Sequence, residues 1–294
     1  MSSGNLTADR RFDYARSLAA AGDHHAAADV MAQALELAPE WAEARFAYAE
    51  ELAAAGARDD AKRAYQAYLA RDPVDSMGAG VRLALLDAAT PDALPEAYMR
   101  RLFDEYAPRF DTALVERLRY QAPEKLAAAI AAVAPQRHFA HALDLGCGTG
   151  LAGAALRDRV ERLEGVDLSP AMVAAAQRKA IYDHLAVSEM VTFVGTAAQP
   201  FDLVIAADVL VYVGDLAPLF AAVARKITAG GLFAFTAQRH DDAGFVLGEE
   251  HRYRHSADYL RAIAAPFEIV TLTPDVFRQE KGIDVPGLLA ILKR

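Results

Sequence analysis

The sequence has little cysteine, little tryptophan and no excess of basic residues. Of its 294 residues one is cysteine, Cys147, and one is tryptophan. A single cysteine excludes a disulfide within the chain and is typical of proteins from reducing compartments. The 31 basic and 40 acidic side chains give a formal net charge of -9. Nucleic acids and anionic membranes are usually bound by basic surfaces, so we expect neither as a partner.

Long apolar runs are also scarce. The apolar segments are shorter than the ~20 residues that a membrane helix needs, and the first residues lack the apolar core of a signal peptide. We therefore expect a cytoplasmic protein. One cysteine and scattered histidines do not form a metal-ligand cluster, so we predict no metal site. The chain is 54% hydrophobic, and its length suits one large domain or two modest ones.

The first 75 residues are predicted to be helical and contain an internal repeat. The string LAAAG occurs at Leu18–Gly22 and again at Leu52–Gly56, 34 residues later. The same offset relates Ala15 to Ala49, Ala27 to Ala61 and Pro39 to Pro73. Small residues let paired helices approach closely, while Gly and Pro end them. This pattern resembles the tetratricopeptide repeat, with residues 74–88 expected to cap the two copies. The alternative is an alanine-rich hairpin repeated by chance.

The composition divides the chain into two domains. We predict a tetratricopeptide-repeat domain over residues 1–90 and a second domain over residues 91–294, with a looser stretch, ATPDALPEA, at their junction. Within the second domain, residues 95–133 are predicted to form lid helices and residues 138–294 the core of a sheet. The lid helices are expected to break at two prolines, Pro108 and Pro123.

From about residue 138, short β-rich runs alternate with helical segments. Apolar strands alternating with helices predict a parallel, doubly wound sheet. The last two runs are separated by a short connection, so the seventh strand is expected to pair antiparallel at the edge. We therefore predict an α/β Rossmann-like fold with a seven-stranded, mostly parallel sheet and an antiparallel edge strand. The expected strands are residues 139–146, 161–169, 183–189, 201–208, 231–238, 267–273 and 288–294.

A glycine-rich loop follows the first expected strand. The sequence LDLGCGTG spans Leu143–Gly150 and carries Asp144 two residues before its first glycine. Ligands of such sheets bind beyond the carboxyl ends of the strands, and glycines let a ligand lie against the backbone. Dinucleotide-binding loops have the spacing G-x-G-x-x-G and face a pyrophosphate, whereas this loop has G-x-G-x-G. An acidic group beside it would repel a pyrophosphate and suits a cation such as a sulfonium with its amino group.

LDLGCGTG resembles motif I of the class I S-adenosylmethionine-dependent methyltransferases. The later segment EGVDLSPAM supports the resemblance, which covers roughly residues 98 to 294. It implies that the first loop holds S-adenosylmethionine through Asp144, Gly146, Cys147 and Gly148. It also implies that Asp167 accepts both ribose hydroxyls, and that Leu168 and Met172 pack against adenine.

The residue that accepts a hydrogen bond from the adenine amino group is harder to identify from the sequence. Many members of the family carry an acid after the third strand, where it meets the adenine amino group, but Thr196 stands at the most similar position here. Glu189 lies twelve residues before Phe201, close to the usual separation. We therefore predict Glu189 as the adenine acceptor, with the amide of Met190 beside it. The alternative is that Glu189 only caps a helix.

The reaction implied by the resemblance is an in-line displacement, in which the enzyme mainly orients the acceptor. An oxygen or nitrogen acceptor can also need a base near neutral pH, and histidine suits that role. We predict His255 as the base, because the surrounding RYRHS is polar. Just past the fourth strand, Tyr212 and Asp208 are predicted to contact the substrate or the cofactor. Two residues of the pre-sheet helices, Tyr106 and Arg109, are predicted to fold over the cofactor and exclude water.

Together these features resemble bacterial repeat-containing methyltransferases. The leading hypothesis is an enzyme that methylates a small molecule or a peptide, with the repeats serving recognition of a protein partner or self-association. The alternative is a non-catalytic adaptor, in which the repeats bind a partner and S-adenosylmethionine is structural. The identity of the methyl acceptor does not follow from the sequence.

Overall fold

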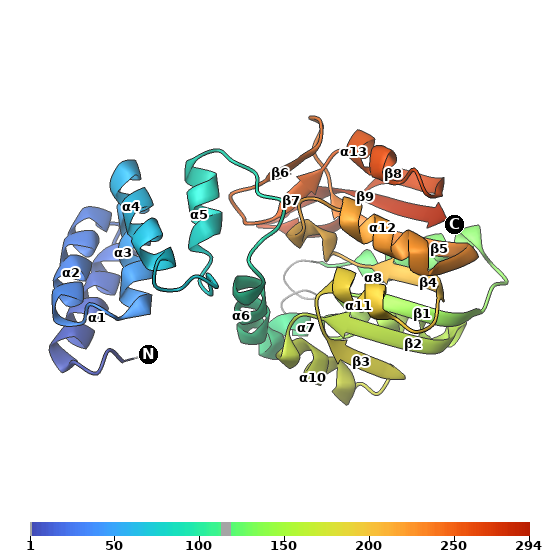
Figure 1. The fold of residues 1–294 in the computed structure, drawn as a ribbon, viewed down its shortest axis with the longest axis horizontal. Coiled ribbons are helices and arrows are strands. Elements are labelled where there is room, and N and C mark those ends of the chain that lie inside the picture. The colour runs from blue at the N-terminus through green and yellow to red at the C-terminus, as the bar shows by residue number, and fades with distance from the viewer. Residues whose placement is uncertain (1, 113–118) are drawn as a thin grey trace. The chain divides into compact units, whose positions relative to one another are not determined.

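The computed structural model describes residues 2–112 and 119–294. They form two compact units (Figure 1). The first, which we call the helical unit, runs to Ala89 and includes Pro95–Tyr98. The second, which we call the sheet unit, comprises Thr90–Leu94 and Met99–Arg294.

The helical unit contains two helix–turn–helix pairs. Both turns end a helix with a glycine in the left-handed region, Gly22 with a φ of 86° and Gly56 with a φ of 79°. Asn5 caps the first helix, because its side chain accepts hydrogen bonds from two backbone N–H groups of the first turn. The helices are α1 (Leu6–Ala20), α2 (His24–Leu37), α3 (Ala42–Ala54), α4 (Arg58–Leu69) and α5 (Ala79–Leu86).

The 34-residue period of the sequence is also a period of the packing. Ala15 and Ala49 occupy equivalent positions of α1 and α3, and both are fully buried. Ala27 and Ala61 do the same in α2 and α4. A residue without a side chain beyond Cβ lets neighbouring helices approach closely, so each pair of alanines marks the contact face of its helix.

Helix α5 packs at the end of the second pair. Phe46, Tyr65 and Tyr68 form one buried cluster with Ala79 of α5. The ring of Phe46 lies edge-on to Tyr65 and Tyr68, with centroids 5.8 and 5.5 Å away. The guanidinium of Arg82, also on α5, lies 4.9 Å from the centre of the Phe46 ring. The segment expected to cap the repeats thus supplies a helix that covers their apolar end.

The sheet unit contains all seven strands expected from the sequence. Their order is β3-β2-β1-β4-β5-β9-β8, and the first five pair in parallel. The reversal of strand order between β1 and β4 places the carboxyl ends of β1, β2 and β4 around one crevice, where ligands of such sheets bind. The strands are β1 (Phe139–Leu145), β2 (Val160–Asp167), β3 (His184–Val187), β4 (Phe201–Ala206), β5 (Ile227–Gln238), β8 (Glu268–Glu280) and β9 (Ile283–Lys293).

The antiparallel strand is not at the edge of the sheet, so that expectation was wrong. Strand β9 lies between β5 and β8 and pairs antiparallel with both. Its residues Leu288–Leu292 are buried in succession, whereas the first half of β8 is largely exposed. A continuous apolar run is typical of a strand covered on both faces. The run LLAIL therefore belongs to an interior strand, and β8 forms the edge.

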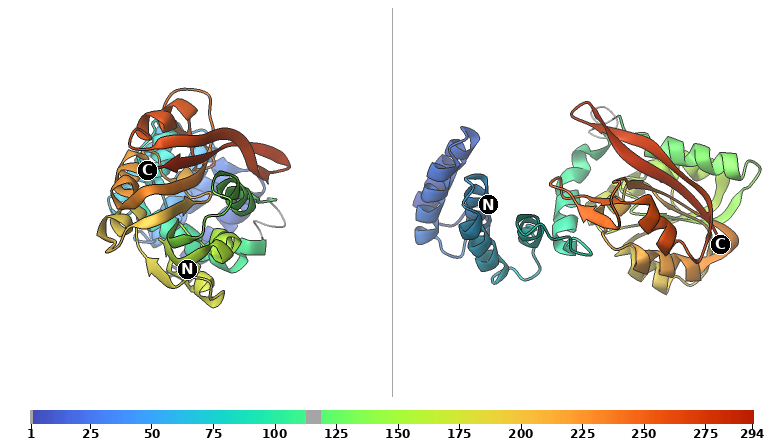
Figure 2. Two further views of the ribbon diagram at one scale, coloured as in Figure 1. Left: turned by 90° about the vertical axis from the view of Figure 1, so that its right-hand side faces the viewer. Right: turned by 90° about the horizontal axis from the view of Figure 1, so that it is seen from above.

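Helices cover both faces of the sheet (Figure 2). Successive strand residues point to opposite faces, so Leu203 and Ile205 of β4 join one core cluster while Val204 and Ala206 join the other. The first cluster lies under α8 (Ala122–Val133) and α9 (Leu151–Leu156), and the second under α11 (Met190–Thr196), α12 (Ala217–Lys226) and α13 (Ala257–Ile263). A further helix, α10 (Pro170–Arg178), follows β2.

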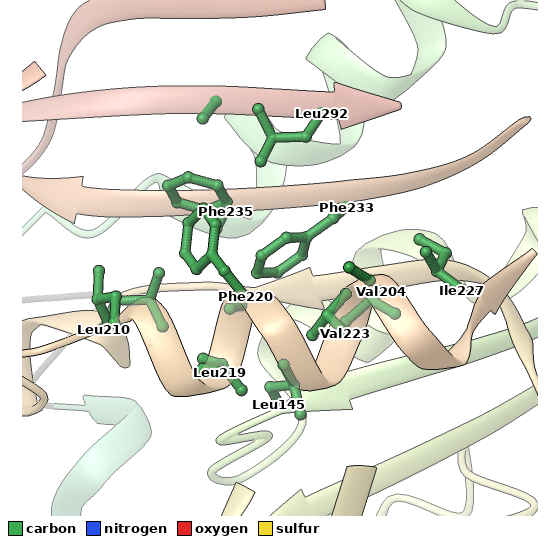
Figure 3. Close-up of a cluster of buried hydrophobic side chains, with 14 of the residues drawn as sticks. Leu145, Val204, Leu210, Leu219, Phe220, Val223, Ile227, Phe233, Phe235 and Leu292 are labelled. Atoms are coloured by element: carbon green, nitrogen blue, oxygen red, sulfur yellow. The ribbon is translucent and has the colours of Figure 1, made fainter. Parts of the chain in front are cut away.

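An aromatic cluster fixes α12 against β5 (Figure 3). The ring of Phe220 lies edge-on to Phe233 and Phe235, with centroids 5.2 and 5.3 Å away. All three are buried, and each such burial contributes roughly 1.5–3 kcal/mol. This packing holds the connection between β4 and α12, which includes Asp208, at a defined place on the sheet.

A small hairpin that the sequence did not predict follows β5. Strands β6 (Phe245–Leu247) and β7 (Tyr253–His255) pair antiparallel. The Tyr253 hydroxyl donates to the carbonyl of Pro91 at 2.9 Å, and the Asp92 carbonyl accepts from the amides of two residues after β4, Gly214 and Asp215. Residues 90–94, expected to be a loose linker, are therefore bound to the sheet unit.

The helices before the sheet broadly follow the prediction. Helix α6 (Glu96–Tyr106) ends just before Pro108, and a second short helix, α7 (Phe110–Thr112), follows. Pro123 lies in the first turn of α8 and begins that helix rather than breaking one. Residues 113–118 of the predicted lid lie outside the described residues. Within the described part of the chain, no helix is both long enough and apolar enough to cross a membrane.

Candidate active site

The loop after β1 needs glycine at its first position. Gly146 has a φ of 62°, and a Cβ placed there would lie 2.2 Å from a methyl carbon of Val209. Gly148 also has a positive φ, 52°. Between them, the backbone N–H of Cys147 donates to the carbonyl of Val166 at 3.0 Å, which brings the loop against β2. The three residues therefore form a tight turn with exposed backbone at the strand ends.

Asp144 lies directly beneath this loop. Its side chain is 1% exposed, and its carboxyl accepts a hydrogen bond from the Tyr182 hydroxyl at 2.6 Å. Burial raises the pKa of Asp144 to about 7. A cation bound beside it would favour the ionised form. The structure thus places the predicted acid where it can interact with a positively charged ligand.

Asp167 joins the loop after β1 to the start of α10. One carboxylate oxygen accepts the Gly148 N–H at 2.9 Å, and the other accepts the Ser169 N–H at 2.8 Å. Burial raises the pKa of Asp167 above its ordinary value. Each carboxylate oxygen has two lone pairs, so both retain capacity for a further donor such as a ribose hydroxyl.

The two residues predicted to pack against adenine lie next to Asp167. Leu168 directly follows it and is half-buried, whereas Met172 lies in the first turn of α10 and is buried. The Ser169 hydroxyl accepts from the Met172 N–H at 3.1 Å and caps this helix. The short segment from β2 into α10 therefore brings these three predicted residues together.

Glu189 caps α11. Its carboxylate accepts the Val191 and Thr192 N–H groups at 2.8 and 2.7 Å. Met190 is the first residue of the helix and packs partly against the core. Because β3 ends at Val187, Glu189 lies at the same strand edge as Asp167. The structure shows the capping role, and the adenine role stays a prediction.

Side chains of α6 and α7 accept hydrogen bonds from the two segments that are predicted to hold the cofactor, the loop after β1 and the start of α10. The Asp104 carboxylate of α6 accepts from the Ser169 hydroxyl at 2.5 Å and from the Ala171 N–H at 3.1 Å. The Asp111 carboxylate of α7 accepts from the Thr149 hydroxyl and forms an ion pair with Lys179 at 2.8 Å. Sequence reasoning missed both contacts, because acids in a helix carry no signal of a partner more than 30 residues away.

Phe110 lies over the glycine loop. Its ring is 3.7 Å from the position that a Cβ on Gly148 would occupy. The predicted lid residues lie behind it: the Tyr106 ring contacts Phe110 with centroids 5.4 Å apart, and the exposed Arg109 lies 5.5 Å from the Tyr106 ring centre. Tyr106 thus reaches the loop through Phe110.

A recess of about 40 Å³ lies between this loop and Phe110. Asp144, Cys147 and Tyr120 are among its lining residues. Burial raises the pKa of the Tyr120 hydroxyl well above its ordinary value. Asp144 suits a positively charged ligand portion, and the recess is smaller than the roughly 300 Å³ that is usual for a ligand pocket.

The two predicted residues past β4 lie on the other side of the recess. Asp208 directly follows Ala207, which lines the recess, and its N–H donates to the Thr236 hydroxyl at 2.9 Å. Burial raises the pKa of the Tyr212 hydroxyl, and the neighbouring charge of Arg252 partly offsets this. Its ring lies edge-on to Phe103 of α6, with centroids 5.1 Å apart.

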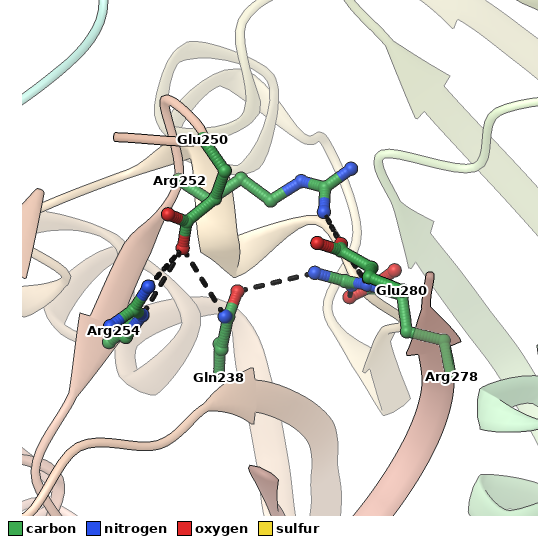
Figure 4. Close-up of polar contacts among 7 residues, drawn as sticks. Gln238, Glu250, Arg252, Arg254, Arg278 and Glu280 are labelled. Carbon is green, nitrogen blue, oxygen red and sulfur yellow. Dashed lines mark hydrogen bonds and ion pairs between the residues drawn. The ribbon is translucent and has the colours of Figure 1, made fainter. Parts of the chain in front are cut away.

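A buried polar network extends from Asp208 (Figure 4). Arg278, 4% exposed, forms an ion pair with Asp208 and donates to the Gln238 amide oxygen at 3.2 Å. It also donates to Glu280 at 3.1 Å, and Arg252 forms an ion pair with the same carboxylate. Sequence reasoning missed this network, whose further members are Glu250 and Arg254.

His255 is not positioned to act on a substrate. Its side chain is 0% exposed, in β7, and its Nε2 contacts the Gly214 carbonyl at 2.9 Å. Burial lowers its pKa to about 4, so the ring is neutral at pH 7. The polar neighbours in RYRHS pointed to a reactive site, but alternation along the strand directs this ring inward, where Phe245 and Tyr259 flank it. The geometry does not support a role as general base.

A larger cavity, of about 320 Å³, lies elsewhere on the sheet. Its floor includes Glu164, which pairs with His141 at 3.0 Å and with Arg162 at 2.6 Å. His141 and Arg162 lie in the first halves of β1 and β2, and Glu164 lies in the middle of β2, so all three lie away from the carboxyl ends that carry the glycine loop. Size alone therefore does not identify the active site in this fold.

Known proteins resemble the segment that carries this site. Residues 143–233 match the family model of a methyltransferase domain. A malonyl-[acyl-carrier protein] O-methyltransferase of Enterobacter lignolyticus is 33% identical over 108 residues, which cover 37% of this chain and 43% of that protein. Nodulation protein S of Rhizobium tropici is 31% identical over 124 residues, 39% of this chain and 51% of that protein.

A solved structure shares the fold. One chain in the complex between the Haloferax volcanii Trm112 methyltransferase activator and a candidate methyltransferase superposes with a TM-score of 0.51, at 20% identity, over 65% of this chain and 96% of that chain. The chain spans about half the length of the curated relatives it matches. The segment that matches a methyltransferase domain, residues 143–233, begins in β1 and includes the glycine loop and Asp167 at the strand ends.

Proposed function

We propose that this protein transfers the methyl group of S-adenosylmethionine to a small molecule or a peptide by in-line displacement. The observation that carries the proposal is the arrangement around Asp167. Its carboxylate joins the glycine loop to the start of α10 at the strand ends, through Gly148 and Ser169. Asp144 lies under the same loop. A buried acid and a half-buried acid beside a glycine-rich backbone suit a ligand that combines a ribose with a positively charged portion.

The residues of the chain have distinct roles in this proposal. S-Adenosylmethionine, when bound, supplies an electrophilic methyl group. Asp167 holds the ribose hydroxyls, Asp144 favours the cationic portion, and the backbone of Gly146, Cys147 and Gly148 gives close access. Leu168 and Met172 cover the adenine, with Glu189 and the Met190 amide at its amino edge. Tyr106 and Arg109 belong to the lid that excludes water, which strengthens the electrostatic interactions inside.

The acceptor is proposed to bind on the side of Asp208 and Tyr212. Correct alignment of an acceptor with a leaving group can lower a barrier by roughly 7–11 kcal/mol. Orientation by these side chains is therefore sufficient for the main catalytic effect. The buried His255 is not carried into this mechanism.

The helical unit is proposed to be a pair of tetratricopeptide repeats with a capping helix. The 34-residue period, the buried alanines and the positive-φ glycines of both turns support this assignment. Such repeats stack into surfaces that bind partners, so we propose recognition of a protein partner or self-association. In the alternative function, an adaptor, this unit would be the active part and the cofactor would be structural.

Asp167→Ala tests the cofactor assignment. We expect the affinity for S-adenosylmethionine, measured by calorimetry, to fall at least about tenfold, because two hydrogen bonds to a charged group are lost. Asp183→Ala is the matched control: its carboxylate also accepts a backbone amide, that of Leu163 in β2, but Asp183 lies just before β3, away from the carboxyl ends of the strands. Equal affinities for Asp167→Ala and the unchanged protein would contradict the assignment.

Turnover separates the enzyme from the adaptor. The protein is incubated with methyl-labelled S-adenosylmethionine and a panel of small molecules and peptides. The proposal expects label in an acceptor and its loss in Asp167→Ala. Tight cofactor binding without label transfer to any acceptor would favour the adaptor.

A further inference from the structure

The acceptor side contains two arginines with different roles. Arg278 is 4% exposed and uses three of its nitrogens, toward Asp208, Gln238 and Glu280. Its donors are directed to partners inside the protein, so it holds the ends of β4, β5 and β8 together. It has little capacity for a ligand.

Arg252 has more N–H donors available for a ligand. Its side chain is 22% exposed and forms an ion pair with Glu280. A guanidinium has five N–H donors, so this ion pair leaves donors for a ligand. Glu280 accepts from both arginines through the same oxygen, Oε1. Figure 4 shows one terminal nitrogen of Arg252 directed to Glu280 and another directed away from the network.

Arg252 is also charged and held in place. Burial would lower its pKa, but the nearby acids Glu280 and Asp208 oppose this, and the pKa is raised overall. The loop that carries Arg252 is closed by the Gly248 N–H, which donates to the Arg252 carbonyl at 2.8 Å. The side chain itself is held by its ion pair with Glu280. A side chain that is already held loses less entropy when it binds a ligand.

The position of Arg252 connects it to the cofactor recess. Tyr212, its electrostatic neighbour, contacts Phe103, and Phe103 lies edge-on to Phe110 with centroids 6.5 Å apart. Phe110 lines the recess. Burial raises the pKa of the Tyr212 hydroxyl, so the hydroxyl keeps its proton and can donate it to an acceptor. The two side chains thus offer a set of donors beside the recess.

We propose that Arg252 and Tyr212 bind a carboxylate group of the methyl acceptor. This proposal rests on the methyltransferase function proposed above and names the acceptor class for the same site. The planar guanidinium matches a carboxylate through two parallel hydrogen bonds. Arg252 is therefore a specificity-determining residue, and the acceptor is an organic acid or a peptide with a free carboxylate.

The charges around the site favour an anion over a cation. Arg252 and Arg278 are balanced by Asp208 and Glu280, so the network is neutral before a ligand binds. A carboxylate would add one negative charge next to Arg252, whereas an ammonium group would be repelled by Arg252. A phosphate is also an anion, so methyl phosphate is the probe that tests whether the site selects a carboxylate.

Binding of simple carboxylates tests the proposal in the full-length protein. The protein is first saturated with S-adenosylhomocysteine, and the arginine side-chain N–H signals are followed by NMR. The probes are butanoate, hexanoate and benzoate, each with its uncharged amide, and methyl phosphate. We expect at least one carboxylate to bind with millimolar affinity and to shift the Arg252 signal, and its amide and methyl phosphate to bind at least about tenfold more weakly.

Variants assign the effect to Arg252. Arg252→Gln should weaken the carboxylate that binds at least about tenfold, and Arg252→Lys should weaken it less, while both keep the affinity for S-adenosylhomocysteine. Arg261→Gln is the matched control, because Arg261 also pairs with an acid, Asp258, on exposed α13. Three outcomes would each overturn the proposal: no carboxylate binds, the amide or methyl phosphate binds equally well, or Arg252→Gln binds the carboxylate unchanged. If S-adenosylhomocysteine itself does not bind, the methyltransferase function fails instead.

Discussion

The two halves of the active-site edge are built in different ways. In the cofactor half, each functional residue lies within a few positions of a strand end: Asp144 and the loop at β1, Asp167 at β2 and Glu189 at β3. In the acceptor half, side chains from four separate segments meet: Asp208, Gln238, Arg252 and the β8 pair Arg278 and Glu280. One half is therefore defined by local backbone geometry and the other by long-range side-chain contacts.

Their electrostatics differ as well. Among the ion pairs of the described residues, none includes Asp144 or Asp167, and burial raises the pKa of both. In the acceptor half, burial raises the pKa of Glu280, but Arg252 and Arg278 more than offset this and lower it overall. The cofactor half thus has acids that a cationic ligand would complete, whereas the acceptor half is already balanced. Substitutions in the two halves should separate cofactor binding from other properties.

We expect the largest loss of stability from a substitution in the cofactor half, which is defined by backbone geometry. Gly146→Ala would place a Cβ 2.2 Å from Val209 at a φ of 62°. Overpacking and the unfavourable backbone region together should cost about 2–4 kcal/mol of stability. Chemical denaturation measures this loss, and calorimetry should show that cofactor binding is lost with it.

Gly195→Ala is the matched control. Gly195 lies in α11, and no atom lies within 4 Å of an added Cβ. Because alanine favours helix more than glycine does, stability should stay the same or rise by about 0.5–1 kcal/mol. A Gly146→Ala protein as stable as this control, with normal cofactor affinity, would show that the loop is not defined by its backbone.

The next effect tests whether His255 is structural. Its pKa is about 4 in the folded protein, because of burial, and the unperturbed value is 6.5. Between these values the unfolded chain binds a proton that the folded protein excludes, so stability falls as the pH falls from 6.5 to 4. The loss from this residue should reach up to about 3 kcal/mol. His255→Gln, measured by denaturation across this range, should lack that part of the pH dependence.

The turnover of His255→Gln distinguishes a structural role of His255 from its predicted role as a general base. The amide of Gln can still donate to the Gly214 carbonyl, so the variant should fold. If His255 is structural, turnover by the folded variant at pH 7.5 should remain within about threefold. A fall of about 10²–10⁴-fold with cofactor affinity preserved would restore the general base.

Much of the fold follows from short-range patterns. The alternation of apolar runs and helices predicted all seven strands of the main sheet, and Gly22 and Gly56 marked both turns of the helical unit. The position of β9 was missed, because pairing between strands distant in sequence is not a local property. The run LLAIL did carry a signal, since five consecutive apolar residues are typical of an interior strand.

The same distinction applies to the site. The loop glycines and Asp167 are placed by a motif whose spacing reflects backbone geometry, and the structure brings them together. Within the polar segment RYRHS the prediction fell on His255, whose side chain is fully buried in the structure. Strand alternation of β7 turns the histidine inward, while Arg252 lies just before the strand. The partner Glu280 lies 28 residues further along the chain, and no sequence pattern announces such a contact.

The smallest effect concerns Glu189, where two roles remain open. The carboxylate caps α11 through the amides of Val191 and Thr192, and it is also predicted to meet the adenine amino group. Glu189→Gln keeps the shape but removes the charge, so the cap should weaken by about 0.5–1 kcal/mol. If adenine also binds there, cofactor affinity should fall about fivefold, because a hydrogen bond to a charged acceptor exceeds a neutral one by about 1 kcal/mol.

Asp23→Asn, the same change at the cap of α2, controls for capping alone. Weaker capping with unchanged cofactor affinity would leave Glu189 as a helix cap and place the adenine amino group elsewhere along the strand edge.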